Sequence, residues 1–307
     1  MRAIVHDPAS PCGLRFADVP IPEPTPSQAL VEVHSISLNF GEIAFIDELR
    51  RPGEVHGWDA AGVVVRRAAD GSGPKEGTRV ASFSGRAGWA ELRAVDTGEL
   101  GIVPDSVDLG AASAIPAAGV SALRAVRALG PVVGRRVLVT GASGGVGRFA
   151  VQLAHRAGAH VVASVGSEAR GEGLRSLGAD EVVVGVDAVD NPVFGVLDNV
   201  GGSLLAKAFA LVERGGSLQS IGMASGEPST IDFELERRRA SGRRIDVFVV
   251  GSSFGTDITY LASLLERGQL DPQIGYRDDW TKVADAAEAL LGRRVLGKAV
   301  LDIRRAS

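Results

Sequence analysis

The sequence is poor in cysteine and in aromatic residues. A single cysteine, Cys12, stands among its 307 residues, which excludes a disulfide framework or a thiolate metal cluster within one chain. Aromatic side chains make up 5% of the composition, and the chain has two tyrosines, Tyr260 and Tyr276. So little cysteine is typical of a protein kept in a reducing compartment, and we expect a cytoplasmic protein.

Long apolar runs and an excess of one charge are also missing. No run approaches the roughly 18 uninterrupted apolar residues of a membrane-spanning helix, and the opening residues MRAIVHDPAS lack the apolar core of a signal peptide. The net charge is −4, and the arginine-rich segment 237–244 lies among acidic residues, as on a solvated helical face. We therefore expect neither a nucleic-acid partner nor a membrane.

The first part of the chain, to about residue 110, is predicted to be β-rich. Short runs of Val, Ile and Ala, broken by Gly and Pro, occur at 2–5, 29–38, 60–68, 79–83 and 89–95. Four prolines between Pro20 and Pro26 exclude a helix or a central strand there, so this segment is an extended connector.

From about residue 115 the pattern changes to alternating strands and helices. Buried strands are predicted at 135–140, 160–165, 181–185, 194–200, 216–222 and 245–250, and helices at 144–158, 168–178 and 203–212. Such alternation is typical of a doubly wound parallel sheet, the Rossmann arrangement. Only eight residues, VDAVDNPV, separate two of these strands, and a parallel crossover usually needs a dozen or more. The helix expected there should be lost or reduced to a turn.

The predicted domains follow from this change of pattern. Residues 115–251 form the nucleotide-binding domain. Residues 1–114 and 252–307 form the other, because helices at 256–267 and around 280–292 and a last strand, KAVLDI, return to it.

The stretch VLVTGASGGVG, residues 137–147, ends a strand and opens a helix. Glycines allow a tight turn and a close approach to a pyrophosphate, whose charge is met by the free N–H groups of the helix start. A short-chain dehydrogenase would also need a Tyr-x-x-x-Lys pair after this motif. The two tyrosines are followed four positions later by Leu264 and Trp280, so that interpretation fails.

The glycine motif and several other stretches resemble the medium-chain dehydrogenase/reductase superfamily, specifically its zinc-independent quinone oxidoreductase branch. They are SLNF (37–40), GWDAAGVV (57–64), GWAEL (88–92), IPAAGVSA (115–122), LGAD (177–180), LDNVGG (197–202), GGSLQSIGMASG (215–226) and GKAVLDI. The resemblance covers nearly the whole chain, and it implies a Rossmann sheet plus a β-rich GroES-like catalytic domain. The chain departs from the family in its short crossover and in Arg124, where relatives often carry an aromatic residue.

The resemblance also implies that no metal is bound. Where zinc-dependent members have Cys, His and Cys ligands, this chain has Asn39, Trp58 and Ala117, and a catalytic zinc needs three donor side chains. Trp58 either fills the space of the metal or, with Phe40, lines the substrate pocket. Asn39 either donates to a substrate carbonyl oxygen or caps the backbone. Asp59 is a buried, hydrogen-bonded acid or a catalytic acid.

We expect NADPH as the cofactor. No acid stands at the end of the second strand until Glu168, which has its own structural explanation in the first turn of a helix, whereas Arg170 could face a 2′-phosphate. Lys298 is either a charge partner of the pyrophosphate or a solvated lysine at a strand end. The predicted cofactor residues are Ser121, Gly144, Gly145, Val146, Ser164, Gly166, Ser167, Arg170, Asn199, Gly222, Met223, Phe248, Val249, Val250 and Lys298.

The sequence is compatible with three functions. The first is NADPH-dependent reduction of a quinone or an α,β-unsaturated carbonyl. The second is reduction of an enoyl thioester, and the third is nucleotide binding without turnover. The apolar strand 245–250 should lie at the sheet edge, where unpaired backbone groups favour a homodimer.

Overall fold

The computed structural model describes residues 1–303, which form two compact units. The β-rich unit comprises residues 1–120 together with the chain from Gly251 onward, and the Rossmann unit comprises residues 121–250. The divisions fall after Val120 and Val250, whereas the sequence placed them after residues 114 and 251. The first shift arises because helix α4 (Pro116–Ala128) begins in one unit and continues into the other.

The β-rich unit is organised by one large sheet around its longest strand, β3 (Gln28–Leu38). The strand order is β14-β15-β3-β4-β5-β7, and β6 also pairs with β3. All pairings are antiparallel except that of β14 with β15. The other strands of this sheet are β4 (Asp59–Arg66), β5 (Arg79–Phe83), β6 (Leu92–Asp96), β7 (Leu100–Ile102), β14 (Ile274–Asp279) and β15 (Lys298–Asp302).

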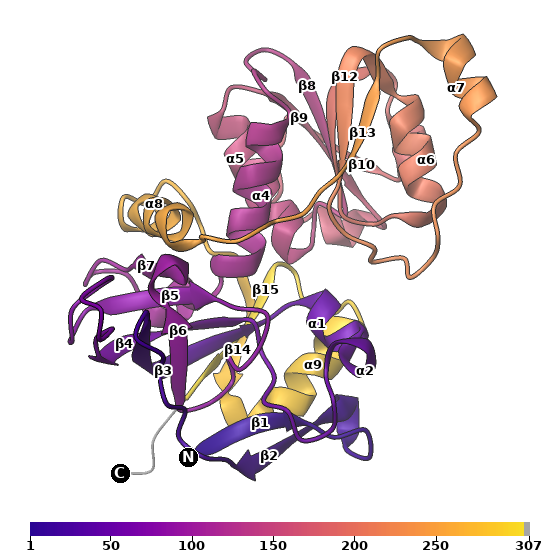
Figure 1. Cartoon of the computed structure of the whole chain (residues 1–307). Coiled ribbons are helices and arrows are strands. Elements are labelled where there is room, and N and C mark those ends of the chain that lie inside the picture. Colours follow the sequence, from indigo (N-terminus) through magenta and orange to yellow (C-terminus); the bar gives the residue numbers. More distant parts are fainter. Residues whose placement is uncertain (304–307) are drawn as a thin grey trace. The chain divides into compact units, whose positions relative to one another are not determined.

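A small hairpin and several short helices complete the β-rich unit (Figure 1). Its main apolar core is centred on Trp89, Trp280 and Ile36. The remaining elements are β1 (Arg2–His6), η1 (Pro11–Gly13), β2 (Leu14–Asp18), α1 (Phe40–Ala44), α2 (Ile46–Leu49), η2 (Thr97–Glu99), α3 (Leu109–Ser113), α8 (Gly255–Glu266), η5 (Trp280–Lys282) and α9 (Val283–Leu291).

The Rossmann unit has a six-stranded, fully parallel sheet in the order β10-β9-β8-β11-β12-β13. Numbered from β8, this is the order 3-2-1-4-5-6 of a doubly wound dinucleotide-binding fold, and its direction reverses between β8 and β11. The strands are β8 (Arg136–Thr140), β9 (His160–Val165), β10 (Glu181–Val184), β11 (Val193–Asp198), β12 (Val212–Ser220) and β13 (Arg244–Val247).

Helices flank this sheet, with α4 and α5 (Gly145–Arg156) on one side and α6 (Gly202–Ala210) and α7 (Phe233–Arg239) on the other (Figure 1). The fold class predicted from the sequence is confirmed: a parallel Rossmann sheet accompanies a β-rich unit. The structure also confirms that the short crossover has no full helix, because only η4 (Val186–Ala188) joins β10 to β11.

Two sequence predictions in the Rossmann unit are wrong in extent. The helix predicted at 168–178 shrinks to the 3₁₀ turn η3 (Glu168–Gly171), followed by turns. Gly173 and Gly178 have φ values of +75° and +104°, which an α-helix cannot contain. The strand predicted at 245–250 ends at Val247. Across the described residues, no helix has both the length and the apolar character needed to span a membrane.

Candidate active site and nucleotide site

The glycine-rich turn joins β8 to α5 and needs glycine at two points. Gly141 has a φ of +58°, in the left-handed region. A Cβ at Gly147 would lie 2.4 Å from the carbonyl oxygen of Gly141, so no larger residue fits. Gly144 precedes the helix and α5 begins at Gly145, whose first-turn N–H groups have no partner within the helix. This turn is therefore shaped to bind an anion.

The parallel strands bring most of the predicted cofactor residues to one edge of the sheet. Ser164 is the penultimate residue of strand β9, and Gly166 and Ser167 follow that strand. The other residues follow the ends of β11, β12 and β13. These later residues are Asn199, Gly222, Met223, Phe248, Val249 and Val250. All lie at the carboxyl edge, where open α/β sheets bind their ligands.

Asn199 lies at the point where the strand order reverses, and two of its hydrogen-bonding groups are used within the protein. Its backbone N–H donates to Thr140 Oγ1 at 3.1 Å and its Nδ2 donates to the Thr140 carbonyl at 2.9 Å. Its Oδ1 is buried without a hydrogen-bond partner. An acceptor left unpaired there is suited to a hydroxyl or amide donor of a bound nucleotide.

Asp198, which sequence reasoning missed, holds this loop in place. The buried carboxylate accepts from Thr140 Oγ1 at 2.5 Å and from the Gly201 N–H at 2.9 Å. Burial raises the pKa of Asp198 above its ordinary value. The signal available in the sequence was its place at the end of an apolar strand in LDNVGG.

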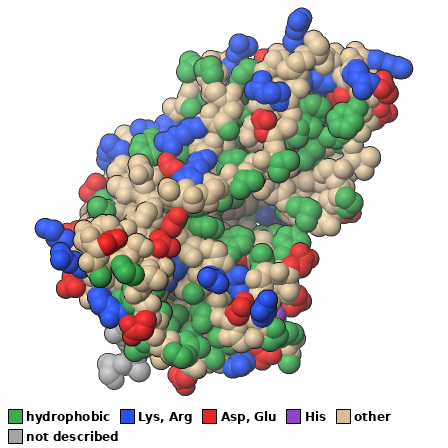
Figure 2. All heavy atoms as spheres, viewed as in Figure 1, with side chains coloured by type: hydrophobic (Ala, Val, Ile, Leu, Met, Phe, Trp, Pro, Cys, Tyr) green, Lys and Arg blue, Asp and Glu red, His purple; other side chains and the backbone are tan. Residues whose placement is uncertain are grey.

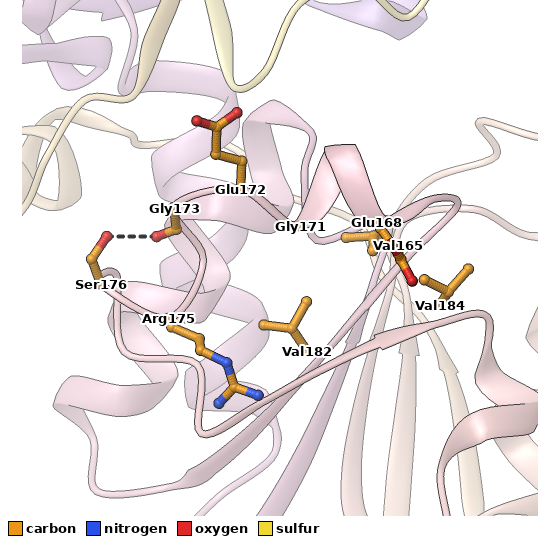
Figure 3. Close-up of a pocket in the computed structure, with 9 residues that line it drawn as sticks. All are labelled: Val165, Glu168, Gly171, Glu172, Gly173, Arg175, Ser176, Val182 and Val184. Carbon is orange, nitrogen blue, oxygen red and sulfur yellow. Dashed lines mark hydrogen bonds between the residues drawn. The ribbon is translucent and has the colours of Figure 1, made fainter.

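Glu168 and Arg170, which are separated by one residue, have different surroundings. The Nε of Arg170 donates to Ser143 Oγ, in the glycine-rich turn, at 2.9 Å. Glu168 instead lines a pocket of about 470 Å³ with Val165 and Val184, on the β10 side (Figure 3). The cation therefore faces the phosphate-binding turn and the acid does not.

A buried cluster in the β-rich unit surrounds Asn39, the N-cap residue of α1. Asn39 Nδ2 donates to Glu42 Oε1 at 3.0 Å and to Asp59 Oδ2 at 2.9 Å, and Lys298 Nζ donates to Asn39 Oδ1 at 2.6 Å. The ammonium fixes which end of the amide is the oxygen. Both amide hydrogens are therefore used by carboxylates.

This geometry corrects the prediction that Asn39 donates directly to a substrate. It has no free amide hydrogen to offer, because Glu42 and Asp59 accept both. The alternative, a capping role, agrees with the hydrogen bond from the Asn39 backbone N–H to Glu42 Oε1 at 2.8 Å. Sequence reasoning missed Glu42, although the Asn39-x-x-Glu42 spacing is that of a capping box.

The prediction that Lys298 pairs with a pyrophosphate is also corrected. Lys298 is 1% exposed, donates to the Leu38 carbonyl at 3.0 Å and lies 3.5 Å from Asp59 Oδ2. Burial lowers the pKa of Lys298, while the nearby carboxylates oppose that change. Its ammonium is the internal counter-charge of the cluster around Asn39.

Asp59 and Glu42 are both fully buried acids, and each has several donors. Asp59 accepts from Ser37 Oγ at 3.1 Å and from the Ala117 N–H at 2.9 Å, so the expectation of a hydrogen-bonded buried acid holds. Burial, and then the charge of Asp59, raise the pKa of Glu42 to about 8. The cluster hence holds two acidic side chains and one ammonium, with Glu42 protonated below about pH 8.

The backbone of Trp58 is held from both sides. Its N–H donates to Glu42 Oε2 at 2.8 Å, and its carbonyl accepts from the buried Arg93 Nη2 at 2.9 Å. Its indole is half-buried, with the ring centroid 6.1 Å from that of Phe83. Phe40 is half-buried too, with the Arg293 guanidinium 5.3 Å from its ring centroid. Neither aromatic residue is fully enclosed by the β-rich unit.

The remaining predicted residue, Ser121, lies in α4 and is the first residue of the Rossmann unit. Of the three positions compared with metal ligands, Asn39 is engaged as above, and Trp58 and Ala117 have no side-chain donor for a metal. Among the described residues, no group of three His, Cys, Asp or Glu side chains is arranged to hold a metal ion.

Comparison with known proteins decides the family. A family model described as zinc-binding dehydrogenase matches residues 145–267. The chain is 30% identical over 330 residues to a quinone oxidoreductase of Pongo abelii, covering 98% of this chain and 97% of the relative. The chain belongs to the medium-chain dehydrogenase/reductase superfamily, in its quinone oxidoreductase-like branch. This medium-chain dehydrogenase/reductase protein is accordingly an oxidoreductase, as the sequence resemblance implied.

Solved structures agree with this assignment. The quinone oxidoreductase of Coxiella burnetii is 25% identical, with a TM-score of 0.87 and coverage of 99% of each chain. A quinone oxidoreductase of Escherichia coli, solved in complex with NADPH, is 21% identical with a TM-score of 0.86, covering 98% of this chain and 100% of that chain. The second likeness concerns the fold alone.

Proposed function

We propose that this protein is a zinc-independent, NADPH-dependent reductase of quinones or α,β-unsaturated carbonyls. Two features of the chain carry the proposal. The Rossmann sheet has predicted cofactor-binding residues along its carboxyl edge, and in the β-rich unit an ammonium, not a metal, lies among the buried acids. Lys298 provides that ammonium, and Trp58 and Ala117 supply no metal donor.

The preference for NADPH over NADH rests on Arg170 and Glu168. An NAD-selective site directs a carboxylate at the ribose hydroxyls, close to the glycine-rich turn. Here Glu168 lines the pocket on the β10 side, and Arg170 reaches Ser143 in that turn. A guanidinium in this position suits a 2′-phosphate. The NADPH complex of the Escherichia coli relative is in keeping with this choice.

The residues of the Rossmann unit would hold the nucleotide at the carboxyl edge of its sheet. The turn at Gly144, Gly145 and Val146 would take the pyrophosphate, and Asn199 Oδ1 would accept a hydrogen bond from the nicotinamide half. Bound NADPH supplies the hydride. The chain's task is then to orient the acceptor and exclude water, which is worth a large part of such a barrier.

On the acceptor side, we propose that Phe40 and Trp58 form the wall of the pocket. Asn39 acts as a positioning residue, because it joins Glu42, Asp59 and Lys298 beneath that wall. Glu42 is fully buried, so its proton is not offered to the acceptor. The enolate or quinol oxygen therefore takes its proton from solvent.

We also propose a cytoplasmic homodimer. Strand β13 lies at the edge of the Rossmann sheet, and Val247 and Val249 are 83% and 78% exposed. Hydrophobic and basic side chains share the nearby surface around α7 (Figure 2). An edge strand with unpaired backbone groups and exposed valines beside it favours pairing with a second copy.

The direct test is a panel of acceptors, each mixed with NADPH or NADH while nicotinamide absorbance is followed. We expect turnover with a quinone or an enone, a higher kcat/KM with NADPH, and no loss after treatment with a chelator. Arg170→Gln should erase the advantage of NADPH, whereas the exposed Arg175→Gln on the same unit should keep it. Tight nucleotide binding with no turnover of any acceptor would identify a binding module instead.

A further inference from the structure

Arg50 and Arg86 are two neighbouring arginines of the β-rich unit. Arg50 follows α2, and its guanidinium donates only to backbone carbonyls, those of Leu49 at 2.7 Å and of Gly85. Arg86 comes directly after Gly85 and is exposed. Burial lowers the pKa of Arg50, the charges of Glu42 and Glu54 oppose that change, and the charge of Arg86 adds a smaller lowering effect. Arg50 is thus bonded to the backbone of the residue that precedes Arg86, and the two are like-charged neighbours.

No carboxylate pairs with either guanidinium among residues 1–303. Glu54 and Glu42 act on Arg50 only from a distance, since Glu54 accepts from the Arg51 N–H and Glu42 from Asn39 and Trp58. Other arginines of this unit do have acidic partners: Arg66 with Glu23, Arg277 with Asp108, and Arg294 with Glu288.

Arg50 also has a donor without a hydrogen-bond partner among the described residues. Its Nε is buried and makes no hydrogen bond. A buried donor without a partner is costly unless a ligand or solvent supplies an acceptor. The positive charge of Arg50, without a paired carboxylate among residues 1–303, is what indicates an anion as the missing partner.

The pair is held beside the predicted wall of the acceptor pocket. The loop that carries Arg86 is fastened to Trp58, because the Ser84 N–H donates to the Trp58 carbonyl at 3.1 Å. Arg93 Nη2 joins the same two segments, donating to the carbonyls of Trp58 at 2.9 Å and Arg86 at 3.2 Å. A buried guanidinium therefore joins the backbones of Trp58 and Arg86.

We propose that Arg50 and Arg86 bind an oxyanion of the acceptor molecule, a phosphate or a carboxylate, beside Trp58. Planar guanidinium groups recognise both anions through paired N–H donors. This rests on the proposed function, and it narrows the acceptor to an anionic quinone or enone, such as an unsaturated acyl thioester whose carrier bears phosphates.

The test compares Arg50→Gln and Arg86→Gln with the protein itself and with Arg66→Gln, which removes a distant, acid-paired arginine. The acceptors are crotonyl-coenzyme A, an unsaturated keto acid and the neutral methyl vinyl ketone. Losing a charged hydrogen-bond partner should raise the KM of an anionic acceptor about tenfold to a hundredfold. Turnover of the neutral ketone and the behaviour of Arg66→Gln should not change.

A larger shift for crotonyl-coenzyme A identifies phosphate as the anion, and a larger shift for the keto acid identifies carboxylate. Equal shifts for charged and neutral acceptors, or none, would overturn the proposal. Calorimetric measurement of the binding of coenzyme A and of the keto acid tests the oxyanion site independently of the proposed reductase activity. If both variants bind coenzyme A or the keto acid more weakly but no acceptor is turned over, the oxyanion site is supported and the proposed reductase activity is rejected. If the neutral ketone is turned over and all variants bind both ligands equally well, the reductase activity is supported and the oxyanion site is rejected.

Discussion

At the scale of single residues, the cluster around Asn39 shows how one ammonium organises several loops. Lys298, from the last strand, reaches an amide and a carboxylate that come from the first 60 residues of the chain. Each donor and acceptor of the Asn39 side chain has an ionisable partner: Glu42, Asp59 or Lys298. Removing Lys298 leaves Asp59 buried without its ammonium partner.

Lys298→Met should therefore destabilise the protein strongly. Losing one partner of a buried ion pair typically costs about 3–5 kcal/mol. Urea unfolding would measure the loss, and Lys282→Met, which removes an exposed lysine paired with Asp285, should change little. Unchanged stability together with weakened NADPH binding would return Lys298 to the cofactor site.

Glu42 should make stability depend on pH. Its pKa rises from 4.5 to about 8 on folding, so the folded state binds more protons than the unfolded state between those values. The contribution of Glu42 is then fully present below about pH 4.5 and is lost as the pH rises toward about 8, by at most roughly 1.4 kcal/mol per pH unit. Denaturation across this window measures it.

Glu42→Gln should flatten that dependence, since an amide does not titrate. Glu48→Gln, at an exposed position in α2, is the matched control and should retain the slope. An equally steep curve in both variants would assign the dependence to other groups.

At the scale of elements, the sequence predicted strands and turns better than contacts. The glycine-rich turn was recognisable because its chemistry lies within eleven residues, 137–147. The contact between Lys298 and Asp59 joins residues 239 positions apart, and no local pattern carries that information. The prediction of a helix at 168–178 is wrong because the segment has apolar residues at helical spacing but also glycines whose positive φ angles end a helix.

The glycine-rich turn itself should not tolerate a side chain. Gly147→Ala would place a methyl group 2.4 Å from a backbone oxygen, so the turn must shift, at a cost of about 1–3 kcal/mol. We expect lower thermal stability and weaker NADPH binding, measured by calorimetry. Gly98→Ala, where a Cβ meets nothing within 4 Å, should alter neither. Normal nucleotide affinity in Gly147→Ala would argue against this turn as the pyrophosphate site.

At the scale of the whole molecule, β13 governs assembly. Replacing the exposed Val247 and Val249 together with Asp should place like charges at the edge where two copies would meet. We expect the mass by light scattering to fall from that of a dimer to that of a monomer. Val133→Asp, also 78% exposed and on the same unit, should remain dimeric. A monomeric mass for the unaltered protein would exclude this assembly.

The β-rich unit is assembled from both ends of the chain, and this sets an order of events during synthesis. Strand β15 lies between β14 and β3, so the central sheet is incomplete until residues 298–302 have been synthesised. Until then Glu42 and Asp59 lack the ammonium of Lys298. The Rossmann unit, by contrast, is continuous from residue 121 to 250 and has every strand it needs beforehand. A nascent chain halted before Lys298 would thus contain every strand of the nucleotide-binding unit, while the sheet of the other unit still lacked a central strand.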